Sequence, residues 1–275
     1  MRFGQLILAL AGVGTGLAPA GAAQVTSYVR YSDGGRTSYG ILEGETIREL
    51  SGSLFNNPRP TGRRVARNRV ELLAPCEPGK VIAVGLNYKS HLGTRPVAPY
   101  PGLFAKMPTS IVGPGAGIRY PPDAENLHYE GELVVVIGRR ASNVAVADAA
   151  RYVFGVTAGN DVSERSWQQN DLQWFRAKAS DTFGPIGPAI VSGLNYNDLL
   201  LQTRLNGEVV QSERTKDLLF DVATIVSYVS RYVTLDPGDV IFTGTPGTTR
   251  PIKPGDVVEV ELEGVGVLRN PVKTP

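Results

Sequence analysis

The sequence of 275 residues is poor in the side chains that most zinc and redox sites use, because it contains one cysteine and two histidines. Cys76 has no cysteine partner, so a disulfide within the chain is excluded. A zinc site is not expected, since so few nitrogen and sulfur ligands are present. A block of basic residues is also missing: the net charge is +2 with both signs interspersed, so nothing indicates nucleic-acid binding. A metal site in this chain would therefore use oxygen ligands.

Long apolar runs are scarce as well, and the one near the N-terminus, residues 6–17, is too short and too rich in glycine to span a membrane. It follows Arg2 and precedes a stretch of small residues, which is the layout of a secretory signal peptide. We therefore expect residues 1–23 to be a signal peptide and the protein to be periplasmic or secreted. The alternative is an N-terminal helix retained in a cytosolic protein.

Glycine and proline are plentiful, with 32 and 20 residues, and no long periodic helix dominates, which predicts a β-rich α+β fold. Residues 24–75 are expected to form a small N-terminal β-unit with a hairpin at Asp33-Gly34-Gly35. Within it, the polar, arginine-rich residues 51–69 are typical of a loop or linker. The catalytic domain is then expected to cover residues 76–275.

In this second part the pattern predicts strands at 81–85 and 186–191, a short helix at 146–153 and a hairpin at Asn206-Gly207. Apolar residues recur at helical spacing from 222 to 233, with Asp221 as the N-cap.

Two carboxylates open the most apolar of these segments. Glu130 and Glu132 precede a run of valine, isoleucine and leucine that predicts a buried strand, and residues i and i+2 of a strand share a face. Adjacent buried carboxylates are costly unless a positive charge lies between them, and a hard divalent cation is the usual solution. Asp161, after a second apolar segment, would supply a third carboxylate. The alternative is that Glu130 and Glu132 lie on a solvated strand edge.

Arg165 and Gln168 follow Asp161 at i+4 and i+7. If a helix begins at Asp161, the three side chains share one face. The alternative is an ordinary aspartate–arginine pair on an exposed helix.

Segments in this region occur in the order found in the fumarylacetoacetate hydrolase family, which the chain resembles over residues 80–272. The matching segments are 85–91, 104–106, 130–132, 160–165, 177–185, 206–207, 238–246 and 254–256. Their shared order and spacing identify the chain as a member of the family. The resemblance implies a mixed β-sandwich or β-roll catalytic domain and a homodimer.

The resemblance also implies residue roles. Glu130, Glu132 and Asp161 match the carboxylates that hold Mg²⁺, with Mn²⁺ or Ca²⁺ as alternatives. The implied contacts to the substrate, a small 2-oxo acid, are Arg165, Gln168, Lys106 and Thr245. His91 matches a catalytic histidine near a mobile lid, and Lys178 would stabilise a developing oxyanion. The alternative for Lys178 is a salt bridge to Asp181.

One position departs from the family pattern. The lid histidine is commonly followed three residues later by a glutamate, whereas Thr94 occupies that place here and carries no charge. The expected activity is metal-dependent hydrolysis of a C–C bond in an acylpyruvate-like or fumarylacetoacetate-like acid. Isomerisation, hydration or decarboxylation on the same scaffold is the alternative that Thr94 favours. A non-catalytic exported protein that binds a metabolite is the third.

Overall fold

The polypeptide folds into three β-sheets with short helices around them, and a computed structural model describes residues 24–274. The strands are β1 (Thr26–Asp33), β2 (Arg36–Glu43), β3 (Thr46–Ser51), β4 (Arg59–Ala66), β5 (Glu71–Leu72), β6 (Val81–Gly85), β7 (Gly102–Lys106), β8 (Ile111–Val112), β9 (Ile118–Arg119), β10 (Leu127–His128), β11 (Gly131–Ile137), β12 (Val153–Asn160), β13 (Ser163–Glu164), β14 (Gly184–Ser192), β15 (Leu200–Leu205), β16 (Glu208–Arg214), β17 (Val240–Phe242), β18 (Val257–Leu262) and β19 (Gly266–Lys273). The α-helices are α1 (Lys89–Leu92), α2 (Arg165–Asn170), α3 (Phe175–Ala179) and α4 (Val222–Ser230). The 3₁₀ helices are η1 (Arg67–Arg69), η2 (Pro108–Ser110), η3 (Val146–Tyr152) and η4 (Thr215–Asp217).

The largest sheet has 12 strands and runs β4-β3-β2-β1-β14-β12-β11-β17-β6-β7, with β5 on β1 and β8 on β14. A second sheet runs β16-β15-β18-β19-β9, and β10 pairs with β13. Antiparallel and parallel pairs are mixed: β17 lies parallel to β6, for example. The expected β-rich α+β fold is confirmed.

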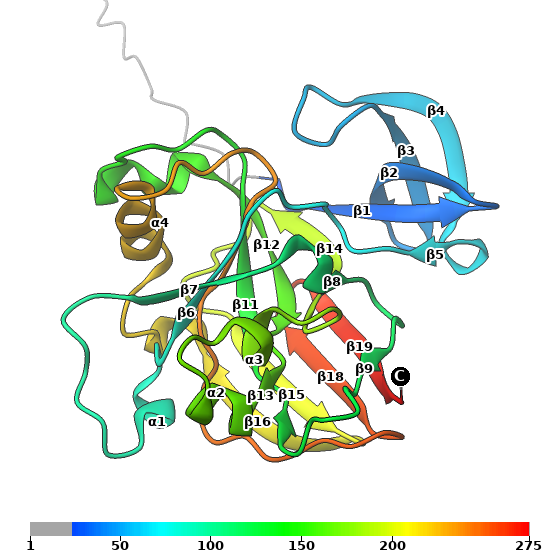
Figure 1. The fold of residues 1–275 in the computed structure, drawn as a ribbon. Helices are drawn as coiled ribbons and strands as arrows, with labels where there is room; N and C mark the ends of the chain where they lie inside the picture. Colours follow the sequence, from blue (N-terminus) through cyan, green and yellow to red (C-terminus); the bar gives the residue numbers. More distant parts are fainter. Residues whose placement is uncertain (1–23, 275) are drawn as a thin grey trace, which may run out of the picture.

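The N-terminal strands β1 to β5 form one end of the large sheet and project from the larger body (Figure 1). They join it through β1, which pairs with β14. The predicted hairpin is confirmed, because Gly34 and Gly35 form a two-residue turn with φ of 58° and 87° between paired Asp33 and Arg36. A domain division near residue 75 stays a prediction.

The loop expected over residues 51–69 is partly wrong, since β4 occupies Arg59–Ala66. This strand pairs with β3 alone and is exposed along nearly its whole length. Charged side chains suit such an edge strand because they discourage further pairing, and backbone pairing needs no apolar pattern. Strand β4 therefore forms through its pairing with β3, and its amino-acid composition alone does not predict it.

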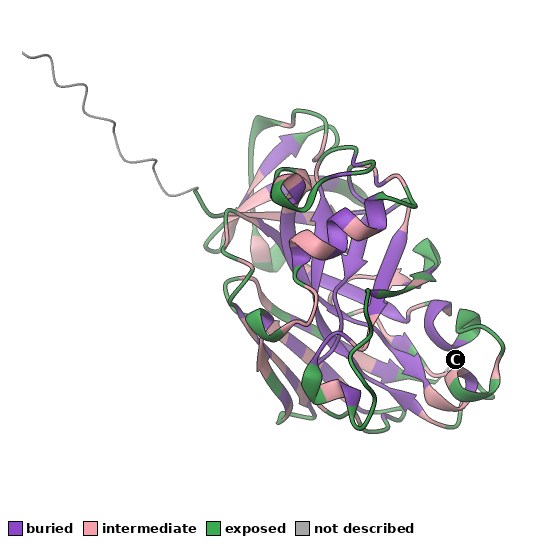
Figure 2. Ribbon diagram, turned by 90° about the vertical axis from the view of Figure 1, so that its left-hand side faces the viewer, coloured by how far each residue is buried: buried purple, intermediate pink, exposed green. Residues whose placement is uncertain are grey.

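The core surrounds β11, all seven residues of which are buried. Leu133, Val135 and Ile137 enter one apolar cluster, and Val134 and Val136 enter another, so both faces of the strand are covered. Figure 2 shows these central strands as buried and the turns around them as exposed. A strand covered on both faces explains the continuous apolar run in the sequence.

Three other local predictions are confirmed. Asn206 and Gly207 form the turn between β15 and β16, with φ of 54° and 87°. Asp221 caps α4 by accepting a hydrogen bond from the Thr224 amide at 2.8 Å. The short helix expected at 146–153 is present as η3. None of the helices in residues 24–274 combines the length and the apolar character that crossing a membrane requires.

Candidate metal and active site

Three buried carboxylates meet where β11 begins and β12 ends. Glu130 and Glu132 flank Gly131, which pairs with Asn160, and Asp161 follows directly. The Asp161 amide donates to the Glu130 carbonyl at 2.8 Å. One ligand oxygen of each carboxylate lies within 4.8 Å of the others, and the three residues are at most 4% exposed. The antiparallel pairing therefore assembles the expected trio, and the solvated-edge alternative is excluded.

The helix expected from Asp161 begins later, because α2 starts at Arg165 after the short strand β13. Glu164 is its N-cap and accepts a hydrogen bond from the Trp167 amide. Arg165 and Gln168 still act together: Arg165 Nη1 donates to Gln168 Oε1 at 2.8 Å. Asp161 takes its place from the strand end rather than from the helix face that we expected.

Two buried lysines form ion pairs with two of the carboxylates, Glu130 and Asp161. Lys178 Nζ donates to Glu130 Oε2 at 2.6 Å and to Asp161 Oδ2 at 2.7 Å. Asp181, the alternative partner, is exposed and lies 3.9 Å from Arg119 instead. Lys106 Nζ donates to Asp161 Oδ1 at 2.6 Å and to the Lys178 carbonyl. Lys178 lines the cavity described below, whereas Lys106 lies behind Asp161 and does not. The expected contact of Lys106 with substrate is therefore replaced by a structural one, because its side chain is fully buried.

The charges divide unequally among these groups. Burial acts against ionisation of Glu130, but Arg165 and Lys178 outweigh it and lower the pKa of its carboxyl. Burial, with Asp161 and Glu130 as like-charged neighbours, raises the pKa of Glu132 well above its usual range. Within residues 24–274, Glu132 makes no ion pair, and its recorded hydrogen-bond donor is the Gly244 amide at 2.7 Å. The cluster therefore has one carboxylate that forms no ion pair with the surrounding lysines and arginine.

This arrangement fits a hard divalent cation. The donor set is all oxygen, which suits Mg²⁺, Mn²⁺ or Ca²⁺. A carboxylate oxygen that accepts one hydrogen bond keeps a second lone pair, so the bonds from Lys178 do not exhaust Glu130 or Asp161. The excess carboxylate, Glu132, is the group that an added cation would stabilise most.

His91 reaches the cluster from α1. Its Nδ1 lies 2.5 Å from the Gly247 carbonyl, and its Nε2 lies 3.8 Å from Glu130 Oε1. A carbonyl only accepts, so Nδ1 carries the proton and Nε2 of the neutral ring presents a lone pair. Thr94 is exposed and does not line the cavity.

Arg165 is held by a network that the sequence did not reveal. Its Nη2 donates to Glu130 Oε1 at 2.5 Å and to Thr249 Oγ1 at 3.0 Å. His128 engages Thr249 through Nδ1 and Asn126 through Nε2, each at 2.8 Å. Burial and then Arg165 lower the pKa of His128 to about 4, so this ring is neutral near pH 7. Both ring nitrogens are occupied, which leaves none for a metal.

Thr245 serves the backbone of the site. Its hydroxyl donates to the Gly131 carbonyl at 2.9 Å and accepts from Gln211 Nε2 at 2.8 Å. The hydroxyl proton is thus used by the Gly131 carbonyl in this structure, while Thr245 also lines the cavity, and its contact with a substrate carboxylate stays a prediction. Gln211 also accepts from the Gly131 amide at 3.1 Å. A side chain at residue 131 would collide with the Thr203 hydroxyl, so glycine is required there.

A cavity of about 700 Å³ opens onto these groups, a volume typical of small-molecule sites. Glu130, Glu132, His91, Arg165 and Lys178 line it. Its remaining lining includes Arg95, Phe104, Gln168, Trp174 and Thr245. Figure 1 shows α2 and α3 beside β13, in the part of the molecule that carries these side chains. The expected site residues therefore line this cavity, except Asp161 and Lys106, which belong to the cluster but not to the cavity lining.

Comparison with known proteins shows which family profiles, relatives and solved structures the chain resembles. Residues 80–273 match the family profile described as Fumarylacetoacetate (FAA) hydrolase C-terminal, and residues 27–75 match Rv2993c-like, N-terminal. Protein Rv2993c of Mycobacterium tuberculosis is 46% identical over 82% of this chain and 88% of its own length. The mitochondrial oxaloacetate tautomerase FAHD2A of Bos taurus is 42% identical over 75% of this chain and 70% of its own. The 5-carboxymethyl-2-hydroxymuconate delta-isomerase of Mycobacterium smegmatis has a TM-score of 0.86 at 43% identity, covering 90% of this chain and 100% of the other.

These relatives overturn the predicted export. The tautomerase is a mitochondrial enzyme rather than a periplasmic or secreted one, so the exported location is wrong. The predicted signal peptide, residues 1–23, lies outside the described residues. The prediction rested on composition alone, namely a short apolar segment after one basic residue. A protein that is not exported can have the same composition at its N-terminus.

Proposed function

The chain belongs to the fumarylacetoacetate hydrolase family, and we propose that it is a divalent-metal-dependent enzyme that interconverts the keto and enol forms of a small 2-oxo acid. Members of this family are enzymes, among them tautomerases and isomerases. The observation that carries the proposal is the orientation of His91, whose Nδ1 faces a carbonyl and whose Nε2 faces the carboxylate cluster. One base with a fixed tautomer is what proton transfer between carbon and oxygen requires.

The chemistry that a Mg²⁺ or Mn²⁺ ion held by Glu130, Glu132 and Asp161 would supply is positive charge beside the substrate oxygens, which lowers the energy of an enolate. The reaction itself then needs one proton to move. His91 Nε2 takes the proton from the carbon next to the carbonyl and returns it to the carbonyl oxygen. Atoms and charge balance without water, and no carboxylate beyond the cluster is needed.

Arg165 and Lys178 orient the acid. Both line the cavity, and both already contact Glu130, so their charge is fixed at one wall. Arg165 keeps a planar guanidinium, which suits a substrate carboxylate. Gln168 lines the cavity and accepts from Arg165 through Oε1, which leaves its side-chain NH₂ as a further donor.

Hydrolysis of a C–C bond is the second candidate. A water would give its proton to His91 Nε2 and attack the distal carbonyl of an acylpyruvate. The bond between that carbonyl carbon and the neighbouring CH₂ would then break, and the proton on Nε2 would pass to the CH₂ carbon, yielding a carboxylic acid and pyruvate. The supporting observation is the 3.8 Å separation of Nε2 from Glu130 Oε1, which puts an imidazolium next to a carboxylate. Glu130 would then take the role of the lid glutamate, whose position Thr94 occupies in this chain.

The test follows ultraviolet enol absorbance with Mg²⁺ and with chelator. Tautomerisation predicts metal-dependent decay of oxaloacetate enol without pyruvate, and its loss in His91→Gln. Pyruvate release from acetylpyruvate would establish hydrolysis instead. Equal rates in chelator, or an unaffected His91→Gln variant, would refute both. The homodimer stays a prediction, which light scattering on the purified protein tests.

A further inference from the structure

Arg95 differs from the other cations of the cavity. It lines the cavity from the exposed loop after α1, and within residues 24–274 its side chain makes no ion pair. Arg165 is paired with Glu130, and Lys178 is paired with Glu130 and Asp161. Arg95 is therefore the lining arginine or lysine whose charge the described protein leaves unmatched.

The loop that carries Arg95 is tethered at both ends. Gly93 ends α1 with φ of 61° and ψ of −121°, a conformation that favours glycine. The Arg95 amide then donates to the Leu92 carbonyl at 3.1 Å. At the far end, Tyr100 stacks on Tyr228 of α4 with centroids 6.1 Å apart and an interplanar angle of 11°. The guanidinium is thus presented by a loop with a defined path.

The segment before the loop is fixed too. The Gly247 amide donates to Ser90 Oγ at 2.9 Å, and His91 Nδ1 contacts the Gly247 carbonyl. His91 and Arg95 consequently come from one anchored stretch of chain. Residues 95–106 contain no aspartate or glutamate, so this stretch offers Arg95 no partner of its own.

The charge count favours a dianionic ligand. Three carboxylates face Lys106, Lys178 and Arg165 in near balance, so Arg95 and a divalent ion make the cavity net positive. A 2-oxo dicarboxylate would neutralise more of that charge than a 2-oxo monocarboxylate. The volume of about 700 Å³ also leaves room beyond a 2-oxo acid group.

We propose that Arg95 is a specificity-determining residue that binds a second carboxylate of the substrate, so that the site selects 2-oxo dicarboxylates over 2-oxo monocarboxylates. The inference rests on the proposed function, because it takes the 2-oxo acid group to lie at the carboxylate cluster. Arginine suits the task, since its fork of donors matches a carboxylate and its charge persists at all working pH values.

The first test compares oxaloacetate with its 4-methyl ester, which has the same skeleton without the distal charge. Arg95→Gln is expected to lower kcat/KM for oxaloacetate about tenfold, through KM, and to change the ester less than twofold. Arg95→Glu should lower it further, and Arg95→Lys should retain most of it. Arg59→Gln on the exposed strand β4 is the matched control and should change neither. Equal effects on both substrates would overturn the proposal.

The second test separates this proposal from the proposed function. Calorimetric titration of the Mg²⁺-loaded protein with 2-oxoglutarate and 2-oxopentanoate measures binding without turnover. If neither oxaloacetate nor its ester reacts but Arg95→Gln weakens 2-oxoglutarate alone about tenfold, the tautomerase proposal fails and the role of Arg95 stands. If turnover is present and the variant binds both acids like the wild type, the proposed role of Arg95 is refuted. Failure of the wild type to prefer 2-oxoglutarate would refute it as well.

Discussion

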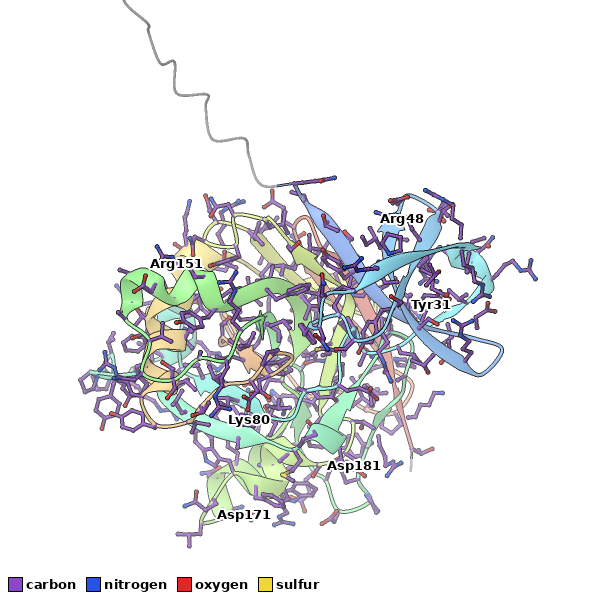
Figure 3. All side chains as sticks on the ribbon, turned by 90° about the horizontal axis from the view of Figure 1, so that it is seen from above. Tyr31, Arg48, Lys80, Arg151, Asp171 and Asp181 are labelled. Carbon is purple, nitrogen blue, oxygen red and sulfur yellow. The ribbon has the colours of Figure 1, made fainter. Side chains whose placement is uncertain are left out.

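Two glutamates of this protein expose almost no surface to solvent, and their pKa values shift in opposite directions. Glu49, on the N-terminal strands, is 2% exposed, and Glu132, in the carboxylate cluster, is 1% exposed. Figure 3 shows Tyr31, a partner of Glu49, well apart from Asp171, which lies next to α2. The pKa of Glu49 is lowered and that of Glu132 is raised. Burial is the largest influence on both and favours the neutral form, but the hydrogen-bond donors around Glu49 outweigh it and those around Glu132 do not.

The partners of Glu49 satisfy it completely. Tyr31 and Arg63 donate to Oε2 at 3.0 Å each, and Arg36 and Thr61 donate to Oε1 at 3.1 and 3.2 Å. Glu132 has one backbone donor and two carboxylate neighbours. The first arrangement stabilises the fold with what the chain supplies. The second leaves Glu132 without a charged partner, and it is the arrangement that we propose a divalent cation completes.

Replacing Glu132 should have the largest effect on function. Glu132→Gln removes a proposed metal ligand, and we expect kcat/KM for the proposed metal-dependent reaction to fall about a thousandfold, because a Lewis acid contributes several kcal/mol to the transition state. In chelator the melting temperature should not fall, since the change removes like-charge repulsion. Enol absorbance and thermal melts measure the two. Near-normal activity of this variant would place the metal elsewhere.

Replacing Lys178 tests whether a metal ion can take over the charge of its ammonium group. Lys178→Met leaves Glu130 and Asp161 buried without this partner, and we expect a loss of about 3 kcal/mol in the free energy of unfolding in chelator. Adding Mn²⁺ should recover part of that loss. Urea unfolding with and without the ion measures both.

Lys80 provides the matched control for that experiment. It pairs with Asp236 and Asp239 at 2.9 and 2.8 Å on a partly exposed surface. Lys80→Met should cost about 1 kcal/mol and should not respond to Mn²⁺. An equal Mn²⁺ effect on both variants would show that the recovery is unspecific.

Glu49→Gln should lower stability by about 2 kcal/mol without changing kcat/KM, because it weakens bonds to a charged acceptor far from the cavity. The pH dependence has a definite sign. A lowered folded pKa gives stability that is present above the unfolded value near 4.5 and is lost as pH falls through the folded pKa. The gap between wild type and variant in urea unfolding should therefore be full at pH 7 and smaller at pH 3. A gap that widens on acidification would contradict this account of Glu49.

The sequence predicted much of the site because its signals are local. Glu130 and Glu132 stand two residues apart before an apolar run, and strand geometry alone places them on one face. Asp161 was proposed from its place after an apolar segment, and the family resemblance supported it, but the helix we considered at that position begins at Arg165. Lys106 was correctly predicted to lie close to the site. A sequence does not show, however, whether such a lysine contacts the substrate or, as here, a buried carboxylate.

The missed features depend on contacts between distant segments. Gln211 comes from β16 in another sheet, yet it binds the Gly131 amide and Thr245. Thr249 links Arg165 to His128 in the cavity lining. Neither residue carries a periodicity or a spacing that points to the cluster. Strand β4 was missed for the same reason, since pairing with β3 rather than its own composition makes it a strand.

The most direct measurement is calorimetric titration of Mn²⁺ into the wild type, Glu132→Gln and Glu49→Gln. The account predicts one ion per chain for the wild type and for Glu49→Gln with the same Kd, and a Kd at least a hundredfold weaker for Glu132→Gln. A wild type that takes up no ion, or a Glu132→Gln variant with an unchanged Kd, would contradict the claim that the buried carboxylates form a metal site.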